Sequence, residues 1–254
     1  MKIAVLMRAV PDPVEELEIG DDGDDLDRDF LGYILNEFDG HALEEGLLLK
    51  EETSGFLAVY GLGTADEVEQ MLHTAIAKGA DEAKMLGEDL DPIDASGQAA
   101  AFANAVRDGG FDLILSGVQA SDELGGQVAM LVAAALGVPH MSVVVSATPD
   151  GDALKVTKEY WGGVTADYRI DLPAVLGIQT AREAPRYVAV ARIRQAQDSG
   201  ALESVDLDQP EPDGRIRITE MRLAEAGEGA EMIEGDEEAA AERIHEILAS
   251  AGVV

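Results

Sequence analysis

The chain of 254 residues contains no cysteine, and 46% of its residues are hydrophobic. This length and composition predict a folded protein with its own core, and the lack of cysteine excludes disulfides, thiolate metal ligands and cysteine nucleophiles. Lysine and arginine number 18 against 51 aspartates and glutamates, so the formal net charge is −33. Such a charge disfavours nucleic acid and anionic membranes as partners.

The acidic surplus is spread along the chain and is not confined to a tail. At high salt the screening length falls to about 3 Å, so this much self-repulsion is tolerated, and we expect a halophilic, archaeal source. No apolar run approaches the roughly 18 residues that a membrane span needs. The apolar start is also too short for a signal peptide. We therefore expect a cytoplasmic protein with no direct membrane insertion.

Strand-like and helix-like segments alternate as far as Pro139. Apolar runs predict strands at residues 3–8, 56–60, 83–86 and 113–115. Helical spacing of apolar residues predicts a helix capped by Asp39 and ending near residues 52–55, one from the capping box of Thr64 and Glu67 to Gly79, and two more at 95–107 and 128–136. Between the first strand and the first helix, residues 12–30 form an acidic hairpin or loop. The alternating order predicts an α/β fold with a doubly wound, mostly parallel sheet and helices on both faces.

Beyond Pro139 the pattern changes to strands around a turn at residues 149–151. Strands at 141–147, 153–160, 164–170 and 174–179 predict an antiparallel or mixed extension of the sheet. A short helix follows at 188–197, then an acidic, proline-rich linker at 206–213. The end, residues 236–250, is an amphipathic helix. We therefore expect a nucleotide-binding domain at 1–204 and an acidic linker with a C-terminal arm at 205–254.

The turn at residues 117–129 joins a buried strand end to a helix start. Such a turn can hold a nucleotide phosphate, because the first N–H groups of a helix have no partners within the helix and its dipole favours an anion. The alternative is a connecting turn whose glycines only permit positive φ and whose aspartate caps a helix. Asp12, Asn36, Asp39 and Gly61 fall at the same carboxyl edge of the sheet, where open α/β sheets bind ligands. We interpret this edge as an adenine-nucleotide crevice.

Catalytic and metal-binding patterns are sparse. The four histidines lack metal-ligand spacing, and no Gly-x-Ser-x-Gly elbow, Walker loop or Gly-x-Gly-x-x-Gly motif follows the first strand. We expect no catalytic residue and no metal site in this chain.

Several segments, in order, resemble the beta subunit of electron transfer flavoproteins. Residues 36–51 resemble the family's Asn-Pro-Phe-Asp…Leu-Lys-Glu segment, residues 75–81 its Ala-Leu-Ala-Met-Gly-Ala-Asp, and residues 117–128 its Gly-x-Gln-Ala-x-Asp…Gln-Val-Gly. Leu-Pro-Ala-Val at 172–175 and Pro-Arg-Tyr at 185–187 fall in the family's order. Glu37 replaces a usual proline, Ala129 a usual glycine, and Trp161 an acid.

The resemblance implies a non-enzymatic electron carrier, a heterodimer in which the alpha subunit holds most of the FAD and this chain holds a structural AMP. Electrons arrive from acyl-CoA dehydrogenases, as in fatty acid β-oxidation, and pass to a membrane quinone reductase. Carried over by position, the residues expected to bind the cofactor are Leu6, Asn36, Phe38, Asp39, Gly61, Gly63, Val118, Gln119, Ala120, Ser121, Asp122, Gly125, Gly126, Gln127, Val128 and Ala129. Among them, Asn36 and Gln119 are expected to bond the adenine edge, and Leu6 with Val59 to flank the ring. Phe38 is equally able to be a core aromatic, and Asp122 is assigned to ribose hydroxyls or helix capping.

The segment near residues 185–200 corresponds to the family's partner-docking loop, with Arg186, Tyr187 and Val190 as its docking residues. Val190 stands where the family has a leucine, and the usual lysine run is absent. The C-terminal helix is expected to dock on the alpha subunit. Two alternatives remain: a bifurcating-type subunit with a second FAD in place of AMP, and an adenine-nucleotide-processing enzyme on a related α/β fold.

Overall fold

The computed structural model describes residues 1–28, 31–87, 90, 93–123, 125–210, 218–224, 229–230 and 232–253. The strands of its main sheet are β1 (Lys2–Met7), β4 (Phe56–Leu62), β5 (Glu82–Leu86), β6 (Leu113–Gly117), β7 (His140–Asp150), β8 (Ala153–Glu159), β9 (Thr165–Asp171), β10 (Ala174–Ile178) and β11 (Leu202–Val205). Their order is β11-β5-β4-β1-β6-β10-β7-β8-β9. From β11 to β7 all neighbours are parallel.

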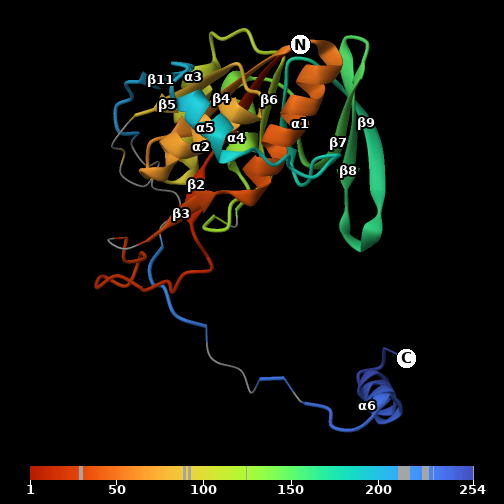
Figure 1. Ribbon diagram of the computed structural model, residues 1–254. Helices are drawn as coiled ribbons and strands as arrows, with labels where there is room; N and C mark the ends of the chain where they lie inside the picture. Colours follow the sequence, from red (N-terminus) through yellow and green to blue (C-terminus); the bar gives the residue numbers. More distant parts are fainter. Residues whose placement is uncertain are drawn as a thin grey trace.

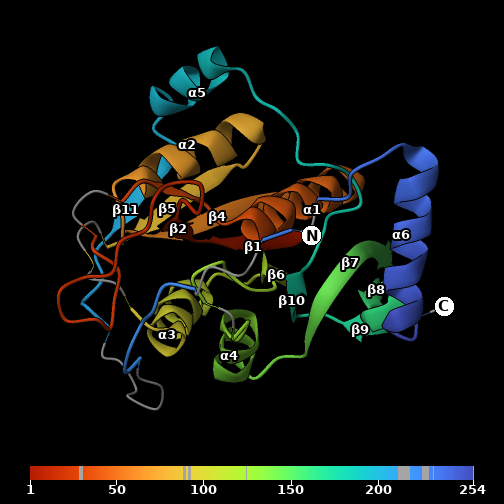
Figure 2. The same cartoon turned by 90° about the horizontal axis from the view of Figure 1, so that it is seen from below.

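The helices are α1 (Glu37–Thr53), α2 (Glu67–Lys78), α3 (Ala95–Val106), α4 (Val128–Leu136), α5 (Val190–Gln197) and α6 (Glu237–Ser250). Figure 2 shows α1, α2 and α5 on one face of the sheet and α3 and α4 on the other. This arrangement confirms the predicted doubly wound fold. A small antiparallel pair, β2 (Ala9–Pro11) with β3 (Tyr33–Leu35), stands beside the main sheet.

The core forms two apolar clusters, one on each face of the sheet. Along β1 the side chains alternate, so Val5 joins the cluster with α1 and α2 while Leu6 joins the cluster with α3 and α4. Phe102 of α3 is the largest fully buried side chain. A strand that is buried on both faces has a continuous run of apolar residues, and such a run predicts β1 from the sequence.

The strands after β7 form the predicted mixed extension. β7 pairs in parallel with β10 and antiparallel with β8, and β8 pairs antiparallel with β9. A short turn of helix, Trp161–Gly163, joins β8 to β9. Figure 1 shows these strands as a long ribbon that extends past the rest of the sheet.

Three local predictions were wrong. Asp39 does not cap α1, because the helix begins at Glu37 after Asn36 and Asp39 is its fully buried third residue. Thr64 and Glu67 do not form a capping box, because α2 begins at Glu67 itself. The turn expected at residues 149–151 falls slightly later, since β7 runs to Asp150. Strand β11 was not predicted at all.

The C-terminal helix forms as predicted, but none of its residues is buried. Ile244, Ile247 and Leu248 are 48%, 38% and 37% exposed, and Figure 1 shows α6 apart from the sheet and its helices. Part of the linker expected at residues 206–213 lies outside the described residues. Among the described helices, none is long and apolar enough to cross a membrane.

Candidate nucleotide crevice

The order of the strands places a topological switch point between β1 and β6. From β1 the chain builds outward through β4 and β5 on one side, and β6 then begins the other side, which β10 and β7 continue. Strand β11 joins the edge beside β5 at the end of the sheet's chain order. The connections therefore diverge at the carboxyl ends of β1 and β6, where an open α/β sheet leaves a crevice for a ligand. The turn predicted to hold a phosphate begins at this point, directly after β6.

Asp39 ties the two strand ends together. One carboxylate oxygen, Oδ2, accepts a hydrogen bond of 2.9 Å from the Arg8 backbone N–H, and the other, Oδ1, accepts one of 2.7 Å from Gly117 N–H. The carboxylate lies in the first turn of α1, where the helix dipole favours a negative charge. A Cβ on Gly117 would lie 2.5 Å from Asp39 Oδ1 and 2.6 Å from Phe38 Cβ, so this approach requires glycine.

Arg8 places a buried positive charge at the same point. Arg8 is only 6% exposed. Its guanidinium forms two ion pairs: Nε lies 3.3 Å from Asp39 Oδ2, and Nη1 lies 3.7 Å from Glu123 Oε2. Sequence reasoning missed both Arg8 and Glu123 as site residues. The available signal was a basic residue directly after a buried strand in a chain with few basic residues.

The turn after β6 is held in place by backbone and amide contacts. Asn36 Nδ2 donates a 2.8 Å hydrogen bond to the Gln119 carbonyl, and Val118 N–H donates a 2.9 Å bond to the Ile178 carbonyl. Gly126 has φ +58°, and a Cβ there would lie 2.9 Å from the Val118 carbonyl oxygen. The N-cap residue of α4, Gln127, makes no side-chain capping bond. The first N–H groups of α4 therefore receive no capping acceptor from it, which suits an anion.

The structure brings most of the predicted cofactor residues to this crevice but not all of them. Asn36, Phe38, Asp39 and the described residues of the turn, 118–123 and 125–127, adjoin the ends of β1 and β6. Within the turn, Ser121, Asp122 and Gly125 are exposed, Ala120 is buried, and Gln119, Gly126 and Gln127 are partly buried. Val128 and Ala129 turn their side chains into the core, each 1% exposed.

Leu6 and Val59 do not form the shared wall that the sequence suggested. Both are fully buried, and they belong to the clusters on opposite faces of the sheet. Gly61 serves packing, because a Cβ there would lie 2.8 Å from Val68 Cγ1 of α2. Gly63 bonds through its N–H and carbonyl to Leu86 and Leu90.

Two buried acids of α1 hold the segment between β10 and α5. Glu45, fully buried, accepts from Arg182 N–H and Nε and also from Ala147 N–H. Glu44 accepts from Arg186 N–H and Nε, and Arg186 Nη1 reaches Glu51 at 2.6 Å. Hydrogen bonds to Glu44 and Glu51 raise the pKa of Arg186. Arg186 is thus engaged within the chain, whereas Tyr187 and Val190 are 88% and 58% exposed.

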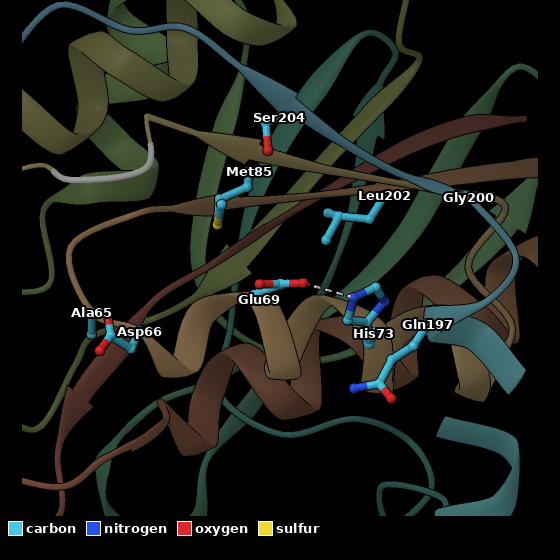
Figure 3. Close-up of a pocket in the computed structure, with 9 residues that line it drawn as sticks. All are labelled: Ala65, Asp66, Glu69, His73, Met85, Gln197, Gly200, Leu202 and Ser204. Atoms are coloured by element: carbon cyan, nitrogen blue, oxygen red, sulfur yellow. Dashed lines mark hydrogen bonds and ion pairs between the residues drawn. The ribbon is translucent and has the colours of Figure 1, made fainter. Parts of the chain in front are cut away.

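A separate cavity of about 620 Å³ lies between α2, β5 and the α5–β11 segment (Figure 3). His73 Nε2 lies 3.3 Å from Glu69 Oε1 within it. Among the described residues that line it, none is a lysine or arginine, and Asp66 and Glu69 make it acidic. Its acidic side chains disfavour a phosphate, even though α2 begins beside the cavity. Within the described part of the chain, no group of three or more acids and histidines could hold a metal ion.

The fold defines a doubly wound α/β protein with a candidate nucleotide crevice at its switch point. Residues 26–210 match the family model described as the electron transfer flavoprotein domain. The chain belongs to the electron transfer flavoprotein family.

Relatives named electron transfer flavoprotein subunit beta match nearly the whole chain. The protein of Methylophilus methylotrophus is 32% identical over 261 residues, covering 98% of each chain. That of Bacillus subtilis is 28% identical with the same coverage. The protein of Syntrophomonas wolfei is 28% identical over 246 residues, covering 97% of this chain and 95% of its own.

Proposed function

We propose that this chain is the beta subunit of a heterodimeric, FAD-containing electron carrier and that it holds one AMP at the switch point of its sheet. The observation that carries the proposal is the Asp39 link between the ends of β1 and β6, which fixes the crevice beside the turn after β6. The family match, which includes both Asp39 and this turn, supports the same assignment.

The residues at the crevice suit an adenine nucleotide. The uncapped start of α4 and the Arg8 guanidinium can hold a phosphate. The Gln119 amide can bond an adenine edge, with Asn36 holding its backbone in place. Asp122, exposed on the turn, can accept hydrogen bonds from ribose hydroxyls. The AMP would be structural, and it takes no part in electron transfer in this proposal.

In this proposal the alpha subunit carries the electrons, and this chain contributes surfaces that contact other proteins. The FAD, held mainly by the alpha subunit, would carry the electrons when bound, and this chain would contribute no catalytic residue. Acyl-CoA dehydrogenase-like proteins would be the donors, and a membrane quinone reductase the acceptor, with the carrier itself in the cytoplasm. The exposed Tyr187, before α5, and Val190, the first residue of α5, are the proposed contact with donors. The uncovered apolar face of α6 is the proposed contact with the alpha subunit.

The test is to co-express the chain with the alpha subunit of the same source and to count cofactors in the purified complex. The proposal predicts a yellow 1:1 complex that contains one FAD and releases one AMP on denaturation. Two flavins per heterodimer would instead support the bifurcating alternative. A colourless, stable monomer that hydrolyses ATP would refute the electron-carrier assignment and support the enzyme alternative.

A further inference from the structure

The buried Arg8 guanidinium at the switch point is shared unequally between two carboxylates. Asp39 is committed to the backbone N–H groups of Arg8 and Gly117 as well as to the guanidinium. Glu123 approaches from the turn after β6, with Oε2 3.7 Å from Arg8 Nη1. That distance is an ion pair without a hydrogen bond, and Oε2 is buried with no hydrogen-bond partner among the described residues. The Glu123 carboxylate is therefore held less well than that of Asp39.

The other side of the Glu123 carboxylate faces the glycine turn. A Cβ on Gly125 would lie 2.5 Å from its Oε1, and the backbone of Gly126 and Gly125 acts to lower the pKa of Glu123. Successive backbone N–H groups in a glycine turn can form a concave site for an anion. With the guanidinium opposite, the geometry is that of an anion site, and the anion in it is the chain's own side chain.

We propose that Glu123 is an internal stand-in for phosphate, which occupies the anion position of the crevice until the phosphate of an adenine nucleotide displaces it and pairs with Arg8. This inference rests on the proposed nucleotide-binding function. It assigns Arg8 as the phosphate-binding cation and Glu123 as the residue that sets the preference for a phosphorylated ligand.

Incomplete pairing of Glu123 and the chain geometry both favour displacement. One guanidinium faces two carboxylates, so the charge of Glu123 is only partly compensated, and burial raises the pKa of Glu123 in spite of the opposing Arg8. A phosphate monoester brings three acceptor oxygens and more charge than a carboxylate, so it can satisfy both Arg8 and the glycine N–H groups. The neighbouring Ser121 and Asp122 are exposed, so the displaced carboxylate has solvent beside it.

The test compares AMP with adenosine, which has the same base and sugar but no phosphate, in calorimetric titrations of the nucleotide-depleted heterodimer at fixed salt. The Glu123→Gln variant keeps the size of the side chain and removes its charge. We expect this variant to bind AMP about tenfold or more tightly than the native complex does, because one charge-assisted hydrogen bond contributes roughly that much to an affinity. Its affinity for adenosine should be unchanged. The matched control is Asp108→Asn, which removes one exposed charge after α3, at the opposite edge of the sheet, and should leave both affinities within about twofold.

An AMP affinity within twofold of the native value in Glu123→Gln would overturn the inference while leaving the nucleotide site intact. An equal gain for AMP and adenosine would also overturn it, because Glu123 would then block the crevice without competing with phosphate. If neither the native complex nor the variants bind AMP, the proposed function itself fails. A melting temperature for each variant, measured on the same samples, identifies any variant that has lost its fold.

Discussion

Replacing Asp39 should remove the hydrogen bonds that link the carboxyl ends of β1 and β6. In Asp39→Ala the backbone N–H groups of Arg8 and Gly117 lose their acceptors, and the Arg8 guanidinium loses its nearest carboxylate. An unsatisfied buried donor costs about 1–3 kcal/mol, and removing one partner of a buried charge pair costs about 3–5 kcal/mol. These costs overlap, because one carboxylate serves all three donors. We therefore expect a loss of about 3–5 kcal/mol in the free energy of unfolding.

Asp39→Asn separates the contributions of the two oxygens. An asparagine retains one acceptor oxygen, so one of the two backbone N–H groups would face an amide NH₂ instead of an acceptor. We expect this variant to be destabilised as well, but by less than Asp39→Ala. The assay is equilibrium denaturant unfolding at fixed salt, with the m-value checked for constancy.

Glu37→Ala is the matched control, since Glu37 carries the same charge in the same first turn of α1 but is exposed. Its cost should stay within about 0.5–1 kcal/mol, the range of an exposed charge near a helix start. If Asp39→Ala costs no more than Glu37→Ala, Asp39 does not hold the strand ends together and the reasoning about the crevice is wrong.

Three further predictions concern the segment before α5 and the C-terminal arm. Arg186→Met should cost about 2–3 kcal/mol in unfolding free energy, because it leaves the buried Glu44 unpaired. The hydrogen bond from Arg186 lowers the pKa of Glu51. The contribution of this pair to stability is therefore complete above the ordinary pKa of a glutamate, and it is lost as the pH falls through the lowered pKa of Glu51. Amide exchange of residues 182–186, corrected for intrinsic rates, should accelerate over that acid range. Deleting the residues after Asp213 should weaken heterodimer formation, measured as a dissociation constant, without emptying the nucleotide crevice.

Each of these predictions has a control or a contrary result. Arg222→Met removes an exposed pair with Glu220 and should change stability by less than about 1 kcal/mol, so an equal cost for Arg186→Met would contradict a buried role. If the corrected amide-exchange rates of residues 182–186 do not change with pH in the acid range, Glu51 does not stabilise this segment. An unchanged dissociation constant after the deletion would rule out the arm as the alpha-subunit contact.

The sequence predicted those parts of the fold that depend on local pattern. Residues 128–136 were predicted as a helix with the bounds of α4, because an alanine- and leucine-rich run ends at Gly137, a residue in the left-handed conformation. The mixed extension followed from the alternation in β8. Strand β11 was missed because it is a short edge strand whose residues are exposed or only partly buried.

The chemistry of the crevice could not be predicted to the same depth. Asp39 was expected to be a helix cap, because an aspartate near a helix start usually is one, and its contacts with Arg8 and Gly117 join residues 31 and 78 positions away. Among 51 acidic residues, nothing local marks Glu44 and Glu45 as buried or Glu123 as a neighbour of Arg8. Those assignments depend on tertiary packing that a single sequence does not display.

The proposed function requires that an adenine nucleotide binds between the ends of β1 and β6. The most direct measurement is photolabelling of the heterodimer with 8-azido-AMP, in competition with AMP, followed by peptide mapping. We expect label in residues 117–127 or 36–38 of this chain, protected by AMP. Label that maps instead to the acidic cavity, around His73 and Gln197, would contradict this expectation.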